Sequence, residues 1–213
     1  MSETTELISK RHLKPWLSIL IFGILQSCIY ALGTYFFDFF AGSATLGFGI
    51  MNEKVWGIGM FFIYMIGYFN AIAVILPVLL IRRFGVATAV YLPYAIVGFF
   101  VEYYYEFLKS HALLGIWAVF GWSLVGLATG FSVDLAFKFL PSQLNYRWRS
   151  ILTGMVLGIA SFLFNLAPLY LFYNTPAQSG PGSYLGVAYF ALPWLIINSS
   201  LGGYTAYAIF KRV

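Results

Sequence analysis

Two glutamates four residues apart, Glu102 and Glu106, stand where two apolar runs meet, and they are the side chains best placed to bind a ligand. An uncharged run ends at Val101, and another begins at Leu113. On a helix, a spacing of four puts both carboxylates on one face. An ionisable group in apolar surroundings is costly, which marks it as a functional candidate. The alternatives are an acid that only ends a helix, for Glu102, and an ion pair with Lys109, for Glu106.

Aromatic and amide side chains could complete a site around these acids. Tyr103 directly follows Glu102. Trp56 and Trp117 lie near the ends of other apolar runs, and each ring could stack on a ring-shaped ligand. Such rings are equally typical of the aromatic belt at a membrane interface. Asn165 lies within an apolar run, where its amide could bind a ligand or only bridge two helices.

Several kinds of catalytic and metal chemistry lack the residues that they need. The sequence has no Gly-x4-Gly-Lys-Ser/Thr phosphate-binding loop. Its single cysteine is Cys28, and its histidines, His12 and His111, are predicted to lie on opposite sides of a membrane. It therefore offers no Cys/His cluster for zinc and no histidine pair for haem. No predicted span places a histidine beside a serine. We expect neither enzymatic activity nor a bound cofactor or metal.

The elements that position these residues follow from the composition, which indicates an integral membrane protein. Of 213 residues, 61% are hydrophobic and 9% are charged, whereas soluble domains carry about 25% charged residues. The sequence predicts an all-α bundle of six transmembrane helices, each able to cross a hydrocarbon core of roughly 30 Å. A polar tail over 1–14 precedes this single domain, which covers 15–213. The expected spans are 15–40, 55–81, 84–107, 112–139, 150–173 and 184–210.

The positions of the charges predict the topology. Ten of the twelve Lys and Arg residues fall in the N-terminal tail, the second and fourth connections and the C-terminus. Cytoplasmic loops carry the excess of basic residues, so both termini are expected in the cytoplasm and the protein in the cell membrane. The net charge of +5 then reflects topology, and no nucleic-acid partner is expected. The spacing of four residues between Asp134 and Lys138 predicts an ion pair between their side chains at the cytoplasmic edge. The acids expected at the outer ends are Asp38, Glu53, Glu102 and Glu106.

Small residues at a spacing of four form stripes on three of the predicted helices. Gly23, Ser27 and Ala31 make one stripe in the first span. Small side chains let helix backbones approach closely, so this stripe either packs inside the bundle or docks a partner subunit. Shorter stripes in the fourth and fifth spans are Gly126 with Gly130 and Gly154 with Gly158.

Four short segments, in this order along the chain, carry a family resemblance. They are 52–57 (Asn-Glu-Lys-Val-Trp-Gly), 80–87 (Leu-Ile-Arg-Arg-Phe-Gly-Val-Ala), 97–102 (Val-Gly-x3-Glu) and 115–117 (Gly-Ile-Trp). In them the chain resembles the substrate-binding (S) components of energy-coupling factor (ECF) vitamin transporters. It is most similar to the branch associated with thiamine and its hydroxymethylpyrimidine precursor. The likeness covers roughly residues 50–165, and it departs from that branch at Phe84, where proline is common.

The resemblance implies a six-helix protein that captures a vitamin or vitamin precursor at the outer face of the membrane. Its implied partners are a transmembrane coupling subunit and two ATPases, which agrees with the missing phosphate-binding loop. For a pyrimidine-type ligand, Glu102 would accept from the exocyclic amine, and Trp56, Tyr103 or Trp117 would stack on the ring. The stripe that begins at Gly23 would dock the coupling subunit.

A rival interpretation comes from another class of protein. A cofactor-free bundle of this composition also suits an accessory subunit of a respiratory or oxidase complex, which packs and orients its neighbours. A basic inner face would suit anionic lipid in either case. Binding of a small ligand by the isolated protein separates the two interpretations.

Overall fold

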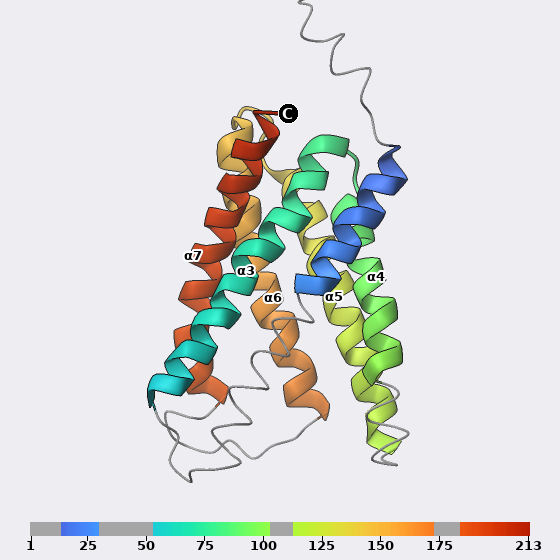
Figure 1. Cartoon of the computed structure of the whole chain (residues 1–213), viewed down its shortest axis with the longest axis vertical. Helices are drawn as coiled ribbons and strands as arrows, with labels where there is room; N and C mark the ends of the chain where they lie inside the picture. Colours follow the sequence, from blue (N-terminus) through green and yellow to red (C-terminus); the bar gives the residue numbers. More distant parts are fainter. Residues whose placement is uncertain (1–13, 30–52, 103–112, 173–183) are drawn as a thin grey trace, which may run out of the picture.

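The protein is described by a computed structural model over residues 14–29, 53–102, 113–172 and 184–213, with side chains over 14–29, 65–96, 124–164 and 192–213. These residues form six helices and no strands, which confirms the all-α prediction (Figure 1). An N-terminal helix is described over 15–29. The others are α3 (Glu53–Ile81), α4 (Val86–Glu102), α5 (Leu113–Phe139), α6 (Tyr146–Phe172) and α7 (Tyr184–Phe210).

The helix boundaries follow the predicted spans closely wherever both are described. The span expected over 55–81 is α3, and the one expected over 184–210 coincides with α7. The fifth begins four residues earlier than predicted, at Tyr146, because Asn145 caps α6 by accepting a hydrogen bond from the Trp148 amide at 3.0 Å. The predicted residues 30–40 and 103–107 lie outside the described part of the chain.

The helices pack in an order that differs from their order in the chain. α4 packs on α5, α5 on α6, α6 on α7, and α7 on α3, whereas α3 and α4 touch only slightly. The N-terminal helix lies on α4, where Gly23 faces Val90 and Pro93. The second half of α3 is the centre of the core, with Val74, Ile75 and Leu79 fully buried. Figure 1 shows α3 crossing the bundle between α7 and the N-terminal helix.

The glycine stripes of α5 and α6 lie at helix contacts, as predicted. A Cβ atom added to Gly130 would lie 2.8 Å from the Ala87 carbonyl oxygen of α4. One added to Gly154 would lie 2.2 Å from the Ser199 carbonyl oxygen of α7. Real Cβ atoms do not approach backbone so closely, so only glycine permits these separations.

Asp134 does not form the predicted local pair with Lys138. Its side chain, only 2% exposed, reaches from α5 to the start of α4 and accepts hydrogen bonds from the Ala87 and Thr88 amides at 3.0 and 2.9 Å. The residue at the N-cap position of α4 is Gly85, which has no side chain to cap the helix. Asp134 therefore caps α4 from a neighbouring helix.

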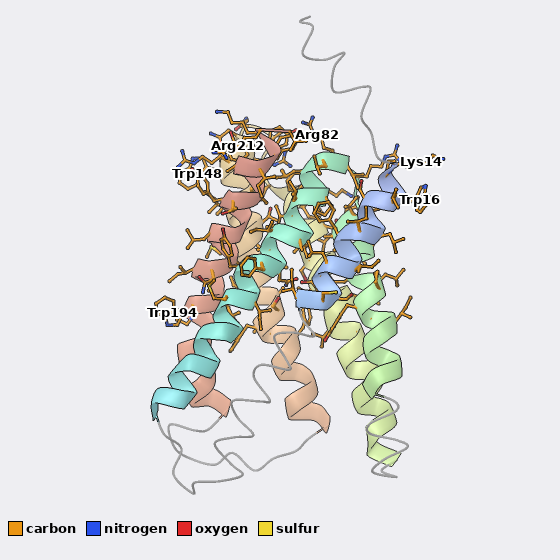
Figure 2. All side chains as sticks on the ribbon, viewed as in Figure 1. Lys14, Trp16, Arg82, Trp148, Trp194 and Arg212 are labelled. Carbon is orange, nitrogen blue, oxygen red and sulfur yellow. The ribbon has the colours of Figure 1, made fainter. Side chains whose placement is uncertain are left out.

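All eight described Lys and Arg side chains lie at the end of the bundle where α3, α5 and α7 finish and α6 begins. Figure 2 shows Lys14, Arg82 and Arg212 at this end. Several lie over aromatic rings: the Arg82 guanidinium is 5.1 Å from the Tyr146 ring centroid, and that of Arg149 is 4.5 Å from the Phe137 centroid. Such contacts hold cations at an aromatic surface. The eight are Lys14, Arg82, Arg83, Lys138, Arg147, Arg149, Lys211 and Arg212; we call this part of the molecule the basic end.

Large apolar side chains cover much of the outer surface between the ends. Each helix contributes some, for example Ile24 (52% exposed), Leu124 (60%) and Leu201 (51%). Nevertheless, among the described residues no helix combines the length with the apolar character that crossing a membrane requires. The transmembrane part of the fold prediction thus stays a prediction.

Candidate functional site

Four of the residues predicted to bind substrate belong to described helices, and all four lie in the half of the bundle away from the basic end. Trp56 is in the first turn of α3, and Glu102 is the last residue of α4. Trp117 is in the second turn of α5, and Asn165 lies seven residues before the end of α6. The helix directions therefore bring these backbone positions to the same half (Figure 1).

The side chains of these four residues lie outside the described part of the chain. Tyr103 and Glu106 lie outside it altogether. Their roles in binding therefore stay predictions.

The stripe predicted to dock a partner is partly used inside the bundle. Gly23 is buried, and a Cβ atom there would lie 2.7 Å from Pro93 Cγ of α4. Ser27 Oγ donates a hydrogen bond to the Gly23 carbonyl oxygen at 2.8 Å. Gly23 thus follows the internal-packing alternative, while Ala31 lies outside the described residues. Docking of a coupling subunit on this stripe is untested.

Two buried carboxamides that the sequence analysis did not single out lie inside the bundle. Gln26, on the N-terminal helix, is 0% exposed, and neither its Oε1 nor its Nε2 has a hydrogen-bond partner among the described residues. Asn70, on α3, is 2% exposed; its Nδ2 donates to the Tyr91 hydroxyl at 2.8 Å, and its Oδ1 has no partner within the part of the chain that the structure describes. Leaving a polar group buried and unpaired costs about 1–3 kcal/mol. A bound molecule could therefore form hydrogen bonds with these three atoms without any further desolvation of the protein.

The local sequence explains why both carboxamides point inward. Gln26 is three residues after Gly23 and four after Phe22, on the helix face that packs against α4 and the core. Asn70 is four residues before the core residue Val74 on α3. A lone amide within an apolar run was the signal that singled out Asn165, and it applies equally to both of these residues.

The two carboxamides lie at the same depth in the bundle. Gln26 is 12 residues after Lys14 along the N-terminal helix, and Asn70 is 12 residues before Arg82 along α3. At 1.5 Å per residue, each is about 18 Å from the basic end. Both helices meet the same stretch of α4, through Gly23 against Val90 and through Asn70 against Tyr91.

The surroundings of the carboxamides carry no described charge. The described cationic side chains are at the basic end, and the one acidic side chain that is described, Asp134, has its oxygens occupied by the start of α4. Within the described residues, no three side chains of the metal-binding types come together. What the arrangement can do is exchange hydrogen bonds with an uncharged polar molecule.

Comparison with known proteins finds no matching family model, no matching characterised protein and no matching solved structure.

Proposed function

We propose that this chain is the membrane-embedded substrate-capture subunit of an ECF-type vitamin transporter, for thiamine or its hydroxymethylpyrimidine precursor. The observation that carries the proposal is the set of buried polar atoms of Gln26 and Asn70 that have no hydrogen-bond partner among the described residues. A protein whose helices only pack gains nothing by keeping such atoms unpaired, whereas a binding protein needs them for its ligand. The resemblance in residues 50–165 supplies the class of ligand.

A location in the cell membrane, with both termini in the cytoplasm, is part of the same proposal. It is supported by the basic end, since cytoplasmic loops are rich in Lys and Arg. Exposed tryptophans support it as well: Trp16 and Trp148 lie beside the basic end in Figure 2, 60% and 51% exposed. Trp194, also 51% exposed, is 17 residues before Lys211, about 26 Å along α7. The separation between the level of Trp194 and the basic end is close to the thickness of a hydrocarbon core of roughly 30 Å.

Capture would take place in the outer half of the bundle. There the carboxylates of Glu102 and Glu106 would hold the amino group or the cationic ring of the ligand, and Trp56, Tyr103 and Trp117 would stack on its rings. A coupling subunit and two ATPases would supply the energy for release on the other side. The placement of Trp56, Glu102 and Trp117 in one half of the fold supports this arrangement.

The experiment that tests the proposal is a thermal-shift series on the purified protein in detergent, with thiamine, hydroxymethylpyrimidine and a panel of other vitamins. A ligand at one hundred times its Kd stabilises a protein by about 2.7 kcal/mol, which raises the melting temperature measurably. We expect a clear rise with thiamine or hydroxymethylpyrimidine. In the same series, Glu102→Gln should raise the Kd about ten-fold or more, because a hydrogen bond to a charged group contributes about 1.5–3 kcal/mol.

A protein that responds to none of these compounds would contradict the proposal. The accessory-subunit interpretation would then predict that a stable partner co-purifies with the chain and raises its melting temperature.

A further inference from the structure

Two arginine side chains at the basic end converge on one aromatic ring. Arg82 directly follows α3, and its guanidinium lies 5.1 Å from the Tyr146 ring centroid and 5.5 Å from that of Phe210, the last residue of α7. Arg149, in the first turn of α6, has its guanidinium 5.8 Å from the same Tyr146 centroid. The two guanidinium carbons are therefore no more than about 11 Å apart. One anion bound beside Tyr146 would feel both charges.

The surrounding fold positions both of these side chains. Arg149 Nη2 donates a hydrogen bond to the Phe137 carbonyl oxygen of α5. Arg82 Nε donates to the Leu79 carbonyl oxygen at 3.4 Å, and the Arg82 backbone has a φ of 54°, which is uncommon for residues other than glycine. Arg82 is exposed and Arg149 is partly exposed, so a ligand can reach them from the surface. Side chains that are already held in place lose less freedom when they bind.

No described acidic side chain neutralises these two charges. The one that is described, Asp134, has its oxygens occupied by the start of α4. The first turn of α6 contains no acid, although the start of a helix itself attracts negative charge. Arg149 is also partly buried, and its Nε has no hydrogen-bond partner among the described residues. Two neighbouring cations with little water and no counter-ion favour a bound anion.

The chemistry of the two groups favours a phosphate, and their location favours a lipid as its carrier. A guanidinium donates pairs of hydrogen bonds that match the oxygens of a phosphate. Trp148 lies at the same end of the bundle in Figure 2 and is 51% exposed. In the proposed membrane location, an exposed tryptophan marks the level of the headgroups. Basic clusters between the cytoplasmic ends of transmembrane helices are typical sites for anionic headgroups.

We infer that Arg82 and Arg149 form, beside Tyr146, a binding site for the phosphate group of an anionic phospholipid. Two of the eight cations, rather than the basic end as a whole, hold this lipid. The site rests on the membrane location that is part of the proposed function, and it does not depend on which vitamin is captured.

The test measures the Kd of the first bound lipid by native mass spectrometry of the full-length protein in detergent. The probes are phosphatidylglycerol, which is anionic, and phosphatidylcholine, which carries the same phosphate without a net charge. We expect the wild type to bind phosphatidylglycerol about ten-fold more tightly than phosphatidylcholine. Arg82→Gln and Arg149→Gln should each weaken the binding of phosphatidylglycerol about ten-fold or more, because each removes a charge-assisted hydrogen bond to the phosphate.

Arg83→Gln is the matched control, since it removes the same charge one residue away. Arg83 is exposed, and among the described residues its guanidinium lies over no ring. Salt at about 0.15 M screens the general attraction of a surface cation, so this variant should keep the Kd within about three-fold of the wild-type value. An equal loss of affinity in Arg83→Gln and Arg82→Gln would overturn the inference, because the lipid would then bind a diffuse basic surface. Arg82→Gln decides the test if Arg149→Gln, which also loses the bond to Phe137, does not fold.

Inorganic phosphate separates the two sources of the same chemistry. At millimolar concentration it should not displace phosphatidylglycerol; displacement would assign the site to a soluble phosphate compound and overturn the lipid as its occupant.

The remaining outcomes separate this site from the proposed function. If both lipids bind equally while a vitamin raises the melting temperature, the lipid site is refuted and the capture function stands. If Arg82→Gln loses affinity for phosphatidylglycerol while no vitamin changes the melting temperature, the lipid site is supported and the capture function is refuted.

Discussion

Asp134 lies on α5 but completes the start of α4, 46 residues earlier in the chain. Its carboxylate receives the Ala87 amide and both the amide and the hydroxyl of Thr88, the last at 2.7 Å. A helix begins with amides that have no partner of their own, and its dipole favours a negative charge there. Because Gly85 cannot supply that charge, a residue from another helix does, and the contact fixes how α4 and α5 sit against each other.

We predict that Asp134→Asn lowers the free energy of unfolding by about 2–3 kcal/mol, since the variant loses the charge and turns one acceptor into a donor that faces an amide. The measurement is the melting temperature in detergent. Ser132→Ala is the control: Ser132 Oγ only donates to the Ala128 carbonyl of its own helix, at 2.9 Å, so little should change. Equal melting temperatures for Asp134→Asn and the wild type would show that the cap contributes nothing to stability.

At the scale of the elements, α7 is held from two sides through adjacent glycines. A Cβ atom added to Gly202 would lie 2.3 Å from the Tyr68 carbonyl oxygen of α3, and one added to Gly203 would lie 2.2 Å from the Ser150 carbonyl oxygen of α6. Helices that approach this closely gain dispersion contacts along their backbones, which is the main attraction between helices in lipid. The pair therefore places α7 between α3 and α6.

The loss of stability on replacing a glycine depends on which atoms the new side chain would meet. Gly203→Ala and Gly154→Ala should each destabilise the fold by about 1–3 kcal/mol, because the added methyl group meets rigid backbone. Gly126→Ala should cost far less, because the nearest atoms, at 3.2 Å, belong to the Tyr91 and Tyr94 rings. Alanine also gains up to about 1 kcal/mol in helix propensity. Denaturation midpoints of the three variants check this order, and a reversed order would contradict the packing described for α6 and α7.

At the scale of the whole molecule, the charges are distributed unevenly, because the described cations gather at the basic end. Eight cations lie there, and the described acid near them, Asp134, is already used as a cap. A surface of this kind is attracted to anionic lipid headgroups, at about 1 kcal/mol per Lys or Arg close to the membrane. In the proposed membrane location, it would therefore favour the leaflet that carries those lipids, the cytoplasmic one.

Orientation can be measured by labelling single cysteines in intact cells. In a Cys28→Ser background, Lys211→Cys at the basic end should react with a membrane-impermeant maleimide only after the cells are opened. Glu53→Cys, at the start of α3 and the other end of the bundle, should react in intact cells. This contrast follows from the positive-inside rule. Labelling of both cysteines in intact cells, or of Lys211→Cys alone, would refute the proposed topology.

The sequence by itself determined the helices, because they depend on neighbours along the chain. Apolar runs bounded by charges and turn residues predicted α3 and α7 to within two residues at each end. It also predicted that cations would cluster, and that Gly130 and Gly154 would lie at close helix contacts. The helices and the glycine contacts are encoded within one or two turns of the chain, whereas the clustering of the cations follows from the alternating direction of successive helices.

Only the tertiary structure decided which helices became neighbours. An i+4 spacing predicted Lys138 as the partner of Asp134. The amides at the start of α4 have no partner within their own helix, whereas an ion pair with a lysine that can reach solvent contributes little, so the carboxylate accepts from the amides instead. The burial of Gln26 and Asn70 was likewise hidden, because an amide in an apolar run looks the same whether it faces the bundle or the outside. Burial and partners depend on contacts between distant segments, and no local pattern records those contacts.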